Sequence, residues 1–289
     1  MSGETVFEEI NGAKANLDYI YDEPDPRNYF NELGKLDYAI PDLAKPIFQK
    51  LISHLRDRKN DTIHILDLGC SYGINAALLK YDLSMSDLYH HWGKETLREA
   101  SSEEVAAHDR DFLNGLDKPA DIEMVGIDLA ASATAFARNA GLLDEDIVVN
   151  LETDPLPEAA KETLAPIDLV TSTGCVGYVT DRSFDRLLPA VTHGQAPWMG
   201  NFVLRLFPFD AIEQSLSEWG YVTEKLEGHT FPQRQFLSPE EQEQVIEQLR
   251  ARGINPAGQE SEGSLLAEFY LSRPAADVAR CPIEQLLAA

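Results

Sequence analysis

A glycine-bearing turn follows a short apolar segment and carries an acidic residue just ahead of it. Residues 65–73 read I-L-D-L-G-C-S-Y-G, so Asp67 precedes Gly69 by two positions. Gly69 allows backbone geometry and a close approach that a side chain would block, and Gly73 lets a following helix pack near the strand. At the tip of a strand, the Asp67 carboxylate would favour a cationic group such as an ammonium. The pattern predicts a ligand-binding turn, with a purely structural turn as the alternative.

The same turn is not a dinucleotide fingerprint. That motif requires glycines at positions 69, 71 and 74, whereas this chain has Ser71 and Ile74. Asp67 would also repel a pyrophosphate. A nicotinamide-dependent oxidoreductase is therefore disfavoured.

A second acidic residue, Asp128, ends the next apolar segment in G-I-D-L, residues 126–129. A carboxylate at this place can accept hydrogen bonds from both hydroxyls of a ribose. The usual spacing from the glycine turn is about 20 residues, and here a polar, helix-prone insertion at residues 84–118 accounts for the excess. A helix-capping aspartate is the alternative, and the two roles can coexist.

At these residues the chain resembles the class I S-adenosylmethionine-dependent methyltransferases, over roughly residues 43–274. The order of four motifs carries the resemblance: D-L-G-C-S-Y-G at 67–73, G-I-D at 126–128, N-L-E at 150–152 and D-L-V-T-S at 168–172. Ser71 departs from the glycine that many relatives have. The resemblance implies S-adenosyl-L-methionine as cofactor.

The resemblance also implies positions for the cofactor's methionine portion. Residues of the turn would line it, namely Gly69, Cys70, Ser71 and Gly73. Asp67 would lie near its amino group, and Ser172 and Thr173 would meet the methionine end from the fourth strand.

The nucleoside portion would lie at the next two strand tips. Asp128, with Leu129 beside it, would hold the ribose, while Asn150 and Leu151 would flank adenine. For Asn150, a turn residue at a strand end is the alternative.

Tyrosines supply the candidate catalytic residues. Tyr178 lies in the segment where this family keeps residues next to the reacting methyl, and its ring or phenol suits a sulfonium. Among the N-terminal tyrosines, which resemble lid material, Tyr21 is favoured as a second catalytic residue and Tyr38 as a cofactor contact. Ordinary packing is the alternative for each.

The elements that must position these residues alternate along the chain. Strands are predicted at 63–68, 124–128, 147–151, 167–172, 202–207, 221–226 and 265–272, with helices between the first five. The prediction is α/β: a Rossmann-like class I methyltransferase fold, a mostly parallel seven-stranded sheet with one antiparallel edge strand and a helical N-terminal lid. Residues 1–60 would form the helical cap, and residues 61–289 the S-adenosylmethionine-binding domain with the helical insertion 84–118.

The composition of the chain disfavours several classes of binding partner. The 289 residues carry a formal net charge of −25, which disfavours a nucleic acid and an anionic membrane. The three cysteines lack metal-ligand spacing, so no metal site is predicted. The acidic N-terminus is unlike a secretion signal, and a cytoplasmic location is expected. A homodimer is compatible with the sequence.

Three functions fit the resemblance. The first is in-line methyl transfer to a small-molecule acceptor. The second is cyclisation of the cofactor itself, which gives azetidine-2-carboxylate and methylthioadenosine. That reaction needs a neutral amine, which a close Asp67 carboxylate opposes. The third is a cofactor-binding protein without catalysis.

Overall fold

The sheet of the computed structural model has the strand order β3-β2-β1-β4-β5-β8-β6, with β7 paired to β8. The structure describes residues 3–59, 61–117 and 121–288. The strands span Ile63–Leu68 (β1), Ile122–Asp128 (β2), Glu145–Val148 (β3), Leu169–Thr173 (β4), Trp198–Leu204 (β5), Tyr221–Lys225 (β6), Phe231–Gln235 (β7) and Ser264–Pro274 (β8). Strands β1 to β5 pair in parallel, and β8 runs antiparallel to β5, β6 and β7. The predicted α/β class, with its mostly parallel sheet and one reversed strand toward the edge, is confirmed.

Strand β7 was not predicted, so the sheet has one strand more than expected. Its sequence is F-P-Q-R-Q, in which Pro232 lacks a backbone donor and the following three residues are polar. The pairing with β8 shifts register between Pro232 and Arg234. The strand forms because β8 is long enough to pair with β5, β6 and β7. That pairing depends on residues far away in the sequence, so the local sequence does not predict it.

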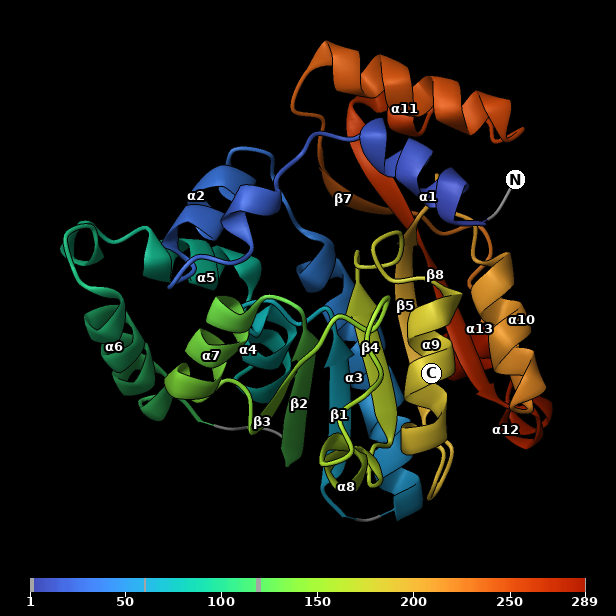
Figure 1. Cartoon of the computed structure of the whole chain (residues 1–289), viewed down its shortest axis with the longest axis horizontal. Helices are drawn as coiled ribbons and strands as arrows, with labels where there is room; N and C mark the ends of the chain where they lie inside the picture. The colour runs from blue at the N-terminus through green and yellow to red at the C-terminus, as the bar shows by residue number, and fades with distance from the viewer. Residues whose placement is uncertain (1–2, 60, 118–120, 289) are drawn as a thin grey trace.

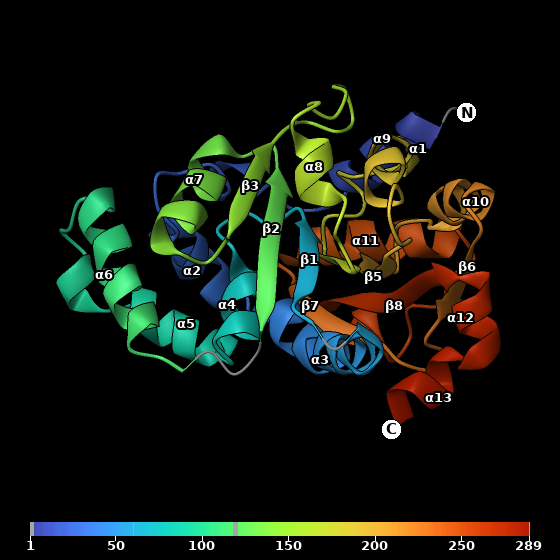
Figure 2. The same ribbon diagram turned by 90° about the horizontal axis from the view of Figure 1, so that it is seen from below.

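Helices cover both faces of the sheet. Figure 2 shows α3 (Ile40–Lys59) on one face, with α8 (Ala160–Leu164), α9 (Asp181–Val191) and α10 (Asp210–Glu218) on the other. The remaining α-helices are α1 (Gly3–Gly12), α2 (Arg27–Gly34), α4 (Ile74–Lys80), α5 (Met85–Trp92), α6 (Ser102–Asn114), α7 (Ala131–Ala140), α11 (Pro239–Ala251), α12 (Ala275–Arg280) and α13 (Ile283–Ala288). Ile47, Leu51 and Leu55 of α3 are buried on one face of the helix at a spacing of four residues, and the helix continues through Pro46.

Residues 84–118 contain helices α5 and α6, joined by the short helix η2 (Glu95–Leu97). Capping boxes begin both α-helices, at Ser84 with Asp87 and at Ser101 with Glu104. Asp109 of α6 binds α5 through both carboxylate oxygens, which contact His91 Nε2 at 2.5 Å and Trp92 Nε1 at 3.0 Å. These contacts hold the two helices together beside the sheet.

The N-terminal segment lies across the end of the sheet where the parallel strands finish (Figure 1). It contains α1, the short helix η1 (Asp18–Ile20) and α2. Asn11 Nδ2 donates to Gly177 O over 2.7 Å, and Ser132 N donates to Asp22 Oδ1 over 2.8 Å. The Tyr72 hydroxyl accepts from Glu23 N over 2.9 Å. The segment is therefore tied to two loops and to the first turn of α7, although the division of the chain at residue 60 stays a prediction.

Within the described residues, no helix combines the length and apolar character that crossing a membrane requires.

Candidate active site

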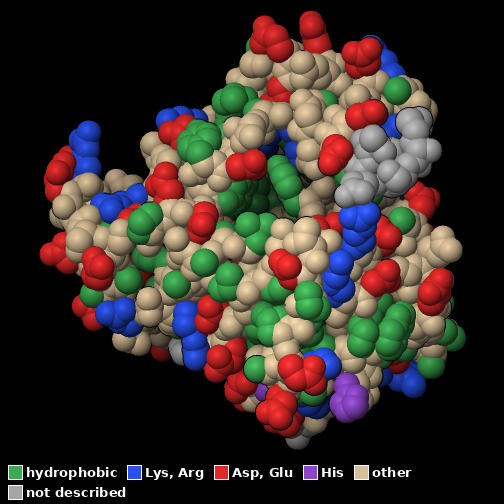
Figure 3. Space-filling view, in the orientation of Figure 1, with side chains coloured by type: hydrophobic (Ala, Val, Ile, Leu, Met, Phe, Trp, Pro, Cys, Tyr) green, Lys and Arg blue, Asp and Glu red, His purple; other side chains and the backbone are tan. Residues whose placement is uncertain are grey.

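A cavity of about 450 Å³ opens at the C-terminal ends of β1, β2 and β4, beneath the N-terminal segment. Figure 3 shows the hollow, with apolar side chains inside it and acidic side chains at its rim. Open α/β sheets bind ligands at this end of their strands. The cavity is therefore the candidate active site.

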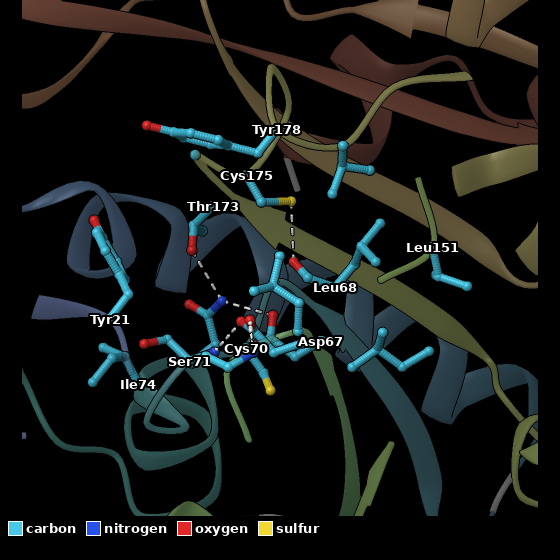
Figure 4. A pocket seen from close by; sticks show the side chains of 18 of the residues that line it. Tyr21, Asp67, Leu68, Cys70, Ser71, Ile74, Leu151, Thr173, Cys175 and Tyr178 are labelled. Atoms are coloured by element: carbon cyan, nitrogen blue, oxygen red, sulfur yellow. Dashed lines mark hydrogen bonds between the residues drawn. The ribbon is translucent and has the colours of Figure 1, made fainter. Parts of the chain in front are cut away.

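Most of the residues predicted from the sequence line this cavity. They are Tyr21, Tyr38, Asp67, Gly69, Cys70, Ser71, Asp128, Leu129, Asn150, Leu151, Thr173 and Tyr178. In Figure 4, Asp67, Cys70 and Ser71 gather at the base of the cavity, while Tyr21 and Tyr178 stand on separate walls. The roles assigned to them individually stay predictions.

Gly73 and Ser172 are not among the residues that line the cavity, and their predicted contact with a cofactor stays a prediction. A Cβ at Gly73 would lie 3.1 Å from the Cβ atom of Ala137 and 3.1 Å from that of Leu142, so this glycine permits close helix packing. Ser172 is fully buried and donates to Asn201 Oδ1 over 3.0 Å. Successive side chains of a strand point to opposite faces, and Ser172 lies in the opposite phase to Thr171 and Thr173.

Gly69 is required by its backbone and by its neighbour. Its φ is +73°, a left-handed conformation, and a Cβ there would lie 2.6 Å from Cys175 Cβ. The thiol of Cys175 in turn donates to Leu68 O over 3.2 Å. The absence of a side chain at position 69 therefore lets the loop after β4 close onto the turn after β1.

Asp67 presents a buried carboxylate with one free oxygen. Its Oδ1 accepts from Asn75 Nδ2 over 2.8 Å and from Thr171 Oγ1 over 2.9 Å. Its Oδ2 has no partner among the described residues. Burial raises the pKa of Asp67 to about 7, because the carboxylate loses hydration. A ligand ammonium at Oδ2 would supply the missing partner and stabilise the ionised form.

Asp128 is held in place by the turn it faces. Its Oδ2 accepts from Ser71 N over 2.8 Å, and its Oδ1 accepts from Ala130 N over 3.0 Å. Each carboxylate oxygen can accept a further hydrogen bond. Ala130 is the N-cap residue of α7 and no side chain caps this helix, so Asp128 fixes the turn before α7 and is not its capping residue.

The far end of the cavity is more open. Leu151 is buried, whereas Leu129 is 64% exposed at the mouth. Asn150 Oδ1 accepts from Glu152 N over 3.0 Å, which fixes the turn after β3. Glu152 then accepts from Thr180 N over 2.8 Å, so this turn braces the loop that carries Tyr178.

Aromatic side chains form the wall next to the N-terminal segment. The Tyr29 ring meets Tyr21 at 5.6 Å and Tyr38 at 6.2 Å between centroids, both edge to face. Burial raises the pKa of Tyr21 above its usual range, so its phenol stays neutral at physiological pH. It can therefore serve as a hydrogen-bonding group and not as a resident phenolate base.

Several lining residues were missed at the sequence level: Asp18, Asp22, Asn75, Cys175 and Gln233. Asn75 follows Gly73 by two residues, and a polar residue in the first turn of the helix after the glycine turn could have been predicted to lie near Asp67. Gln233 comes from β7, about 160 residues farther along the chain than Asn75, and no local pattern identifies it. Asp18 and Asp22 reach the cavity through the course of the N-terminal segment.

Among known proteins, only solved structures show similarity to this chain. No protein-family model matches the chain, and no curated protein matches it. Solved structures to which it is similar include the plantazolicin methyltransferase BpumL in complex with SAH, at 14% identity and a TM-score of 0.46, covering 95% of this chain and 100% of that one.

Two further structures are similar over most of the chain. One is a functionally unknown protein from Deinococcus radiodurans R1, at 14% identity and a TM-score of 0.39, covering 93% of this chain and 97% of that one. The other is magnesium protoporphyrin IX methyltransferase from Synechocystis PCC 6803 with bound SAM, at 9% identity and a TM-score of 0.37, covering 81% and 82%. Because these scores are low, the fold assignment rests on the strand order itself.

Proposed function

We propose that this chain binds S-adenosylmethionine and catalyses transfer of its methyl group to a small molecule. The observation that carries the proposal is the placement of Asp67 and Asp128 on one cavity, on either side of the Gly69 turn. Asp67 pairs with Gly126 in the parallel register, so Asp128 lies two residues farther along the neighbouring strand.

The lining suits the three parts of this cofactor. The free Oδ2 of Asp67 matches an ammonium, and the outer edge of Asp128 matches the two hydroxyls of a ribose. Leu151, beside Asn150, offers an apolar surface for adenine. The volume of about 450 Å³ falls within the range of small-molecule sites, about 300–1,000 Å³.

When bound, S-adenosylmethionine supplies a methyl group already activated by its sulfonium. The residues of this chain are then left with positioning, desolvation and any proton transfer. Tyr21, Tyr29 and Tyr38 form an aromatic wall that limits access of water from the N-terminal side. Tyr178, 51% exposed, stands where an acceptor could enter.

Cyclisation of the cofactor is the second candidate. The aromatic wall favours it, because a closed pocket would leave little room for a separate acceptor. Asp67 disfavours it, because an ionised carboxylate beside the amine stabilises the ammonium and removes the nucleophilic lone pair. A protein that binds the cofactor without turnover is the third.

The nucleoside product separates these functions. Purified protein is incubated with S-adenosylmethionine, alone and with pools of small-molecule acceptors, and the nucleosides are identified by mass spectrometry. Acceptor-dependent S-adenosylhomocysteine supports methyl transfer. Methylthioadenosine formed without acceptor would establish cyclisation instead, and cofactor binding by calorimetry with no product from any pool would establish a binding protein.

A further inference from the structure

The cavity is lined by carboxylates and, among the described residues, by no lysine, arginine or histidine. Five acidic residues contribute: Asp18, Asp22, Asp67, Asp128 and Glu152. With a formal net charge of −25 on the whole chain, the site favours cationic over anionic ligands.

All but one of these carboxylates already have an assigned partner. Asp67 and Asp128 belong to the proposed cofactor site. Asp22 accepts from Ser132 N over 2.8 Å, and Glu152 accepts from Thr180 N over 2.8 Å. The carboxylate of Asp18 makes no hydrogen bond or close ion pair with the described residues, although its charge acts on Lys14, and it is exposed at the cavity mouth.

Gln233 is a second polar group without a partner at this cavity. Its side chain lines the cavity and is 8% exposed, yet its carboxamide has no hydrogen bond among the described residues. The backbone is fixed, because Ala39 N donates to Gln233 O over 2.9 Å. A Cβ at Gly174 would collide with Gln233 Nε2, so the amide nitrogen packs directly against this glycine. The polar atoms of this carboxamide are not among the fully buried unpaired ones, so they are accessible from the cavity and can hydrogen-bond to a ligand there.

Two cationic side chains lie near Asp18 and Gln233, but they do not make this part of the cavity positively charged. Arg234 is neutralised by Glu241, which accepts its Nη1 over 3.1 Å and its Nη2 over 2.5 Å. Lys14 Nζ lies 4.7 Å from the centroid of the Tyr178 ring, and burial together with Arg234 lowers the pKa of Lys14 to about 7. The ring of Tyr178 thus already interacts with an amine of the protein itself.

We propose that the reacting group of the acceptor is an amine, bound between Asp18, Gln233 and the rings of Tyr21 and Tyr178. The inference rests on the proposed methyl transfer and names its substrate class. Asp18 and the rings attract the protonated amine, and Gln233 orients it. Asp18 is exposed and its charge is screened by solvent, so it stabilises an ammonium far less than the buried Asp67 does, and the amine gives one proton to water at the mouth before it reacts. Its nitrogen lone pair forms the N–C bond, while the electron pair of the broken C–S bond stays on sulfur. The excess proton on nitrogen then leaves to water.

Calorimetry on the full chain saturated with S-adenosylhomocysteine tests the substrate class. Three probes share one aromatic skeleton: phenethylamine, phenethyl alcohol and phenylacetate. We expect phenethylamine to bind most tightly and phenylacetate most weakly. Asp18→Asn should weaken phenethylamine binding about two- to fivefold, as for an exposed ion pair, and leave the alcohol unchanged. Gln233→Leu should weaken it about three- to tenfold. Asp57→Asn, an exposed aspartate outside the cavity, is the matched control.

The outcomes separate this inference from the proposed function. If S-adenosylhomocysteine binds but phenethylamine binds no better than the alcohol, or not at all at millimolar concentration, the amine class is wrong. Tighter binding of phenylacetate would overturn it equally. If S-adenosylhomocysteine itself does not bind, the proposed function fails, and the amine inference fails with it.

Discussion

Asn75 donates its side-chain amide to Asp67 Oδ1 over 2.8 Å and thereby leaves Oδ2 as the free edge of that carboxylate. The same amide donates to Thr173 Oγ1 over 3.1 Å, so one helix residue joins the tips of β1 and β4. The orientation of Asp67 toward the cavity therefore depends on a residue of α4 as well as on its own strand.

Replacing Asn75 tests that positioning role. Asn75→Ala leaves Asp67 with Thr171 as its remaining donor, and the carboxylate gains freedom to rotate. We expect the affinity for S-adenosylhomocysteine, measured by calorimetry, to fall about tenfold. Asn114→Ala, at an exposed asparagine of α6, should leave affinity unchanged. An Asn75→Ala protein with undiminished affinity would show that Asp67 is not oriented in this way.

Cofactor affinity should depend on pH through Asp67. The pKa of this carboxyl is raised to about 7 in the ligand-free protein, chiefly by burial. Below that pH the group is neutral and attracts an ammonium weakly, so affinity should fall as the pH drops through about 7. Calorimetric titrations of S-adenosylhomocysteine at about pH 6 and about pH 8 provide the measurement. Asp67→Asn should bind weakly at both values, and a wild-type affinity that does not change with pH would count against the contact.

The same burial means that Asp67, when ionised, lowers the free energy of unfolding of the ligand-free protein. Its pKa is raised from the model-compound value of 3.8, so the neutral form is the one the fold favours. The associated stability is complete below about pH 4 and is lost as the pH rises through about 7. Asp67→Asn should therefore raise the melting temperature by several degrees at or above neutral pH, and by much less in mild acid. A lower melting temperature at neutral pH would contradict this account.

Glycine at position 69 should be more costly to replace than glycine elsewhere with the same backbone conformation. Gly141 has a φ of +84° and open space where a Cβ would stand, so Gly141→Ala should destabilise the fold by about 1 kcal/mol from strain alone. Gly69→Ala adds the collision with Cys175, and we expect at least about 2 kcal/mol. Urea unfolding of both variants measures the difference. Equal losses would mean that the loop after β4 moves aside freely.

The C-terminal ends of β1 and β2 could be predicted because the pattern that marks them lies within a few consecutive residues. An apolar run that ends in Asp67 or Asp128 next to glycine identifies both the strand and the end at which a ligand binds. The reversed β8 was predicted for a similar reason, since residues 265–272 form a long, largely apolar run. Whether Ser172 faces the cavity could not be predicted, because the run of β4 is apolar or small on both faces and leaves the alternation of its side chains undetermined.

The rest of the site depends on contacts between distant segments. Gln233 lies on a strand whose sequence is polar and contains Pro232, and only the pairing with β8 makes it a strand. Asp18 and Asp22 reach the cavity because Asn11 binds the loop at Gly177 and Ser132 binds Asp22. No spacing pattern within the N-terminal segment encodes those partners.

Asp67 and Asp128 should hold one ligand between them, with Asp128 on the ribose. The most direct test is calorimetric titration of S-adenosylhomocysteine into the wild-type chain and Asp128→Ala. We expect S-adenosylhomocysteine to bind the wild type and to lose about 1–3 kcal/mol of binding free energy in the variant, because the hydrogen bonds to the ribose are left unmade. Equal affinity for the two proteins would contradict it.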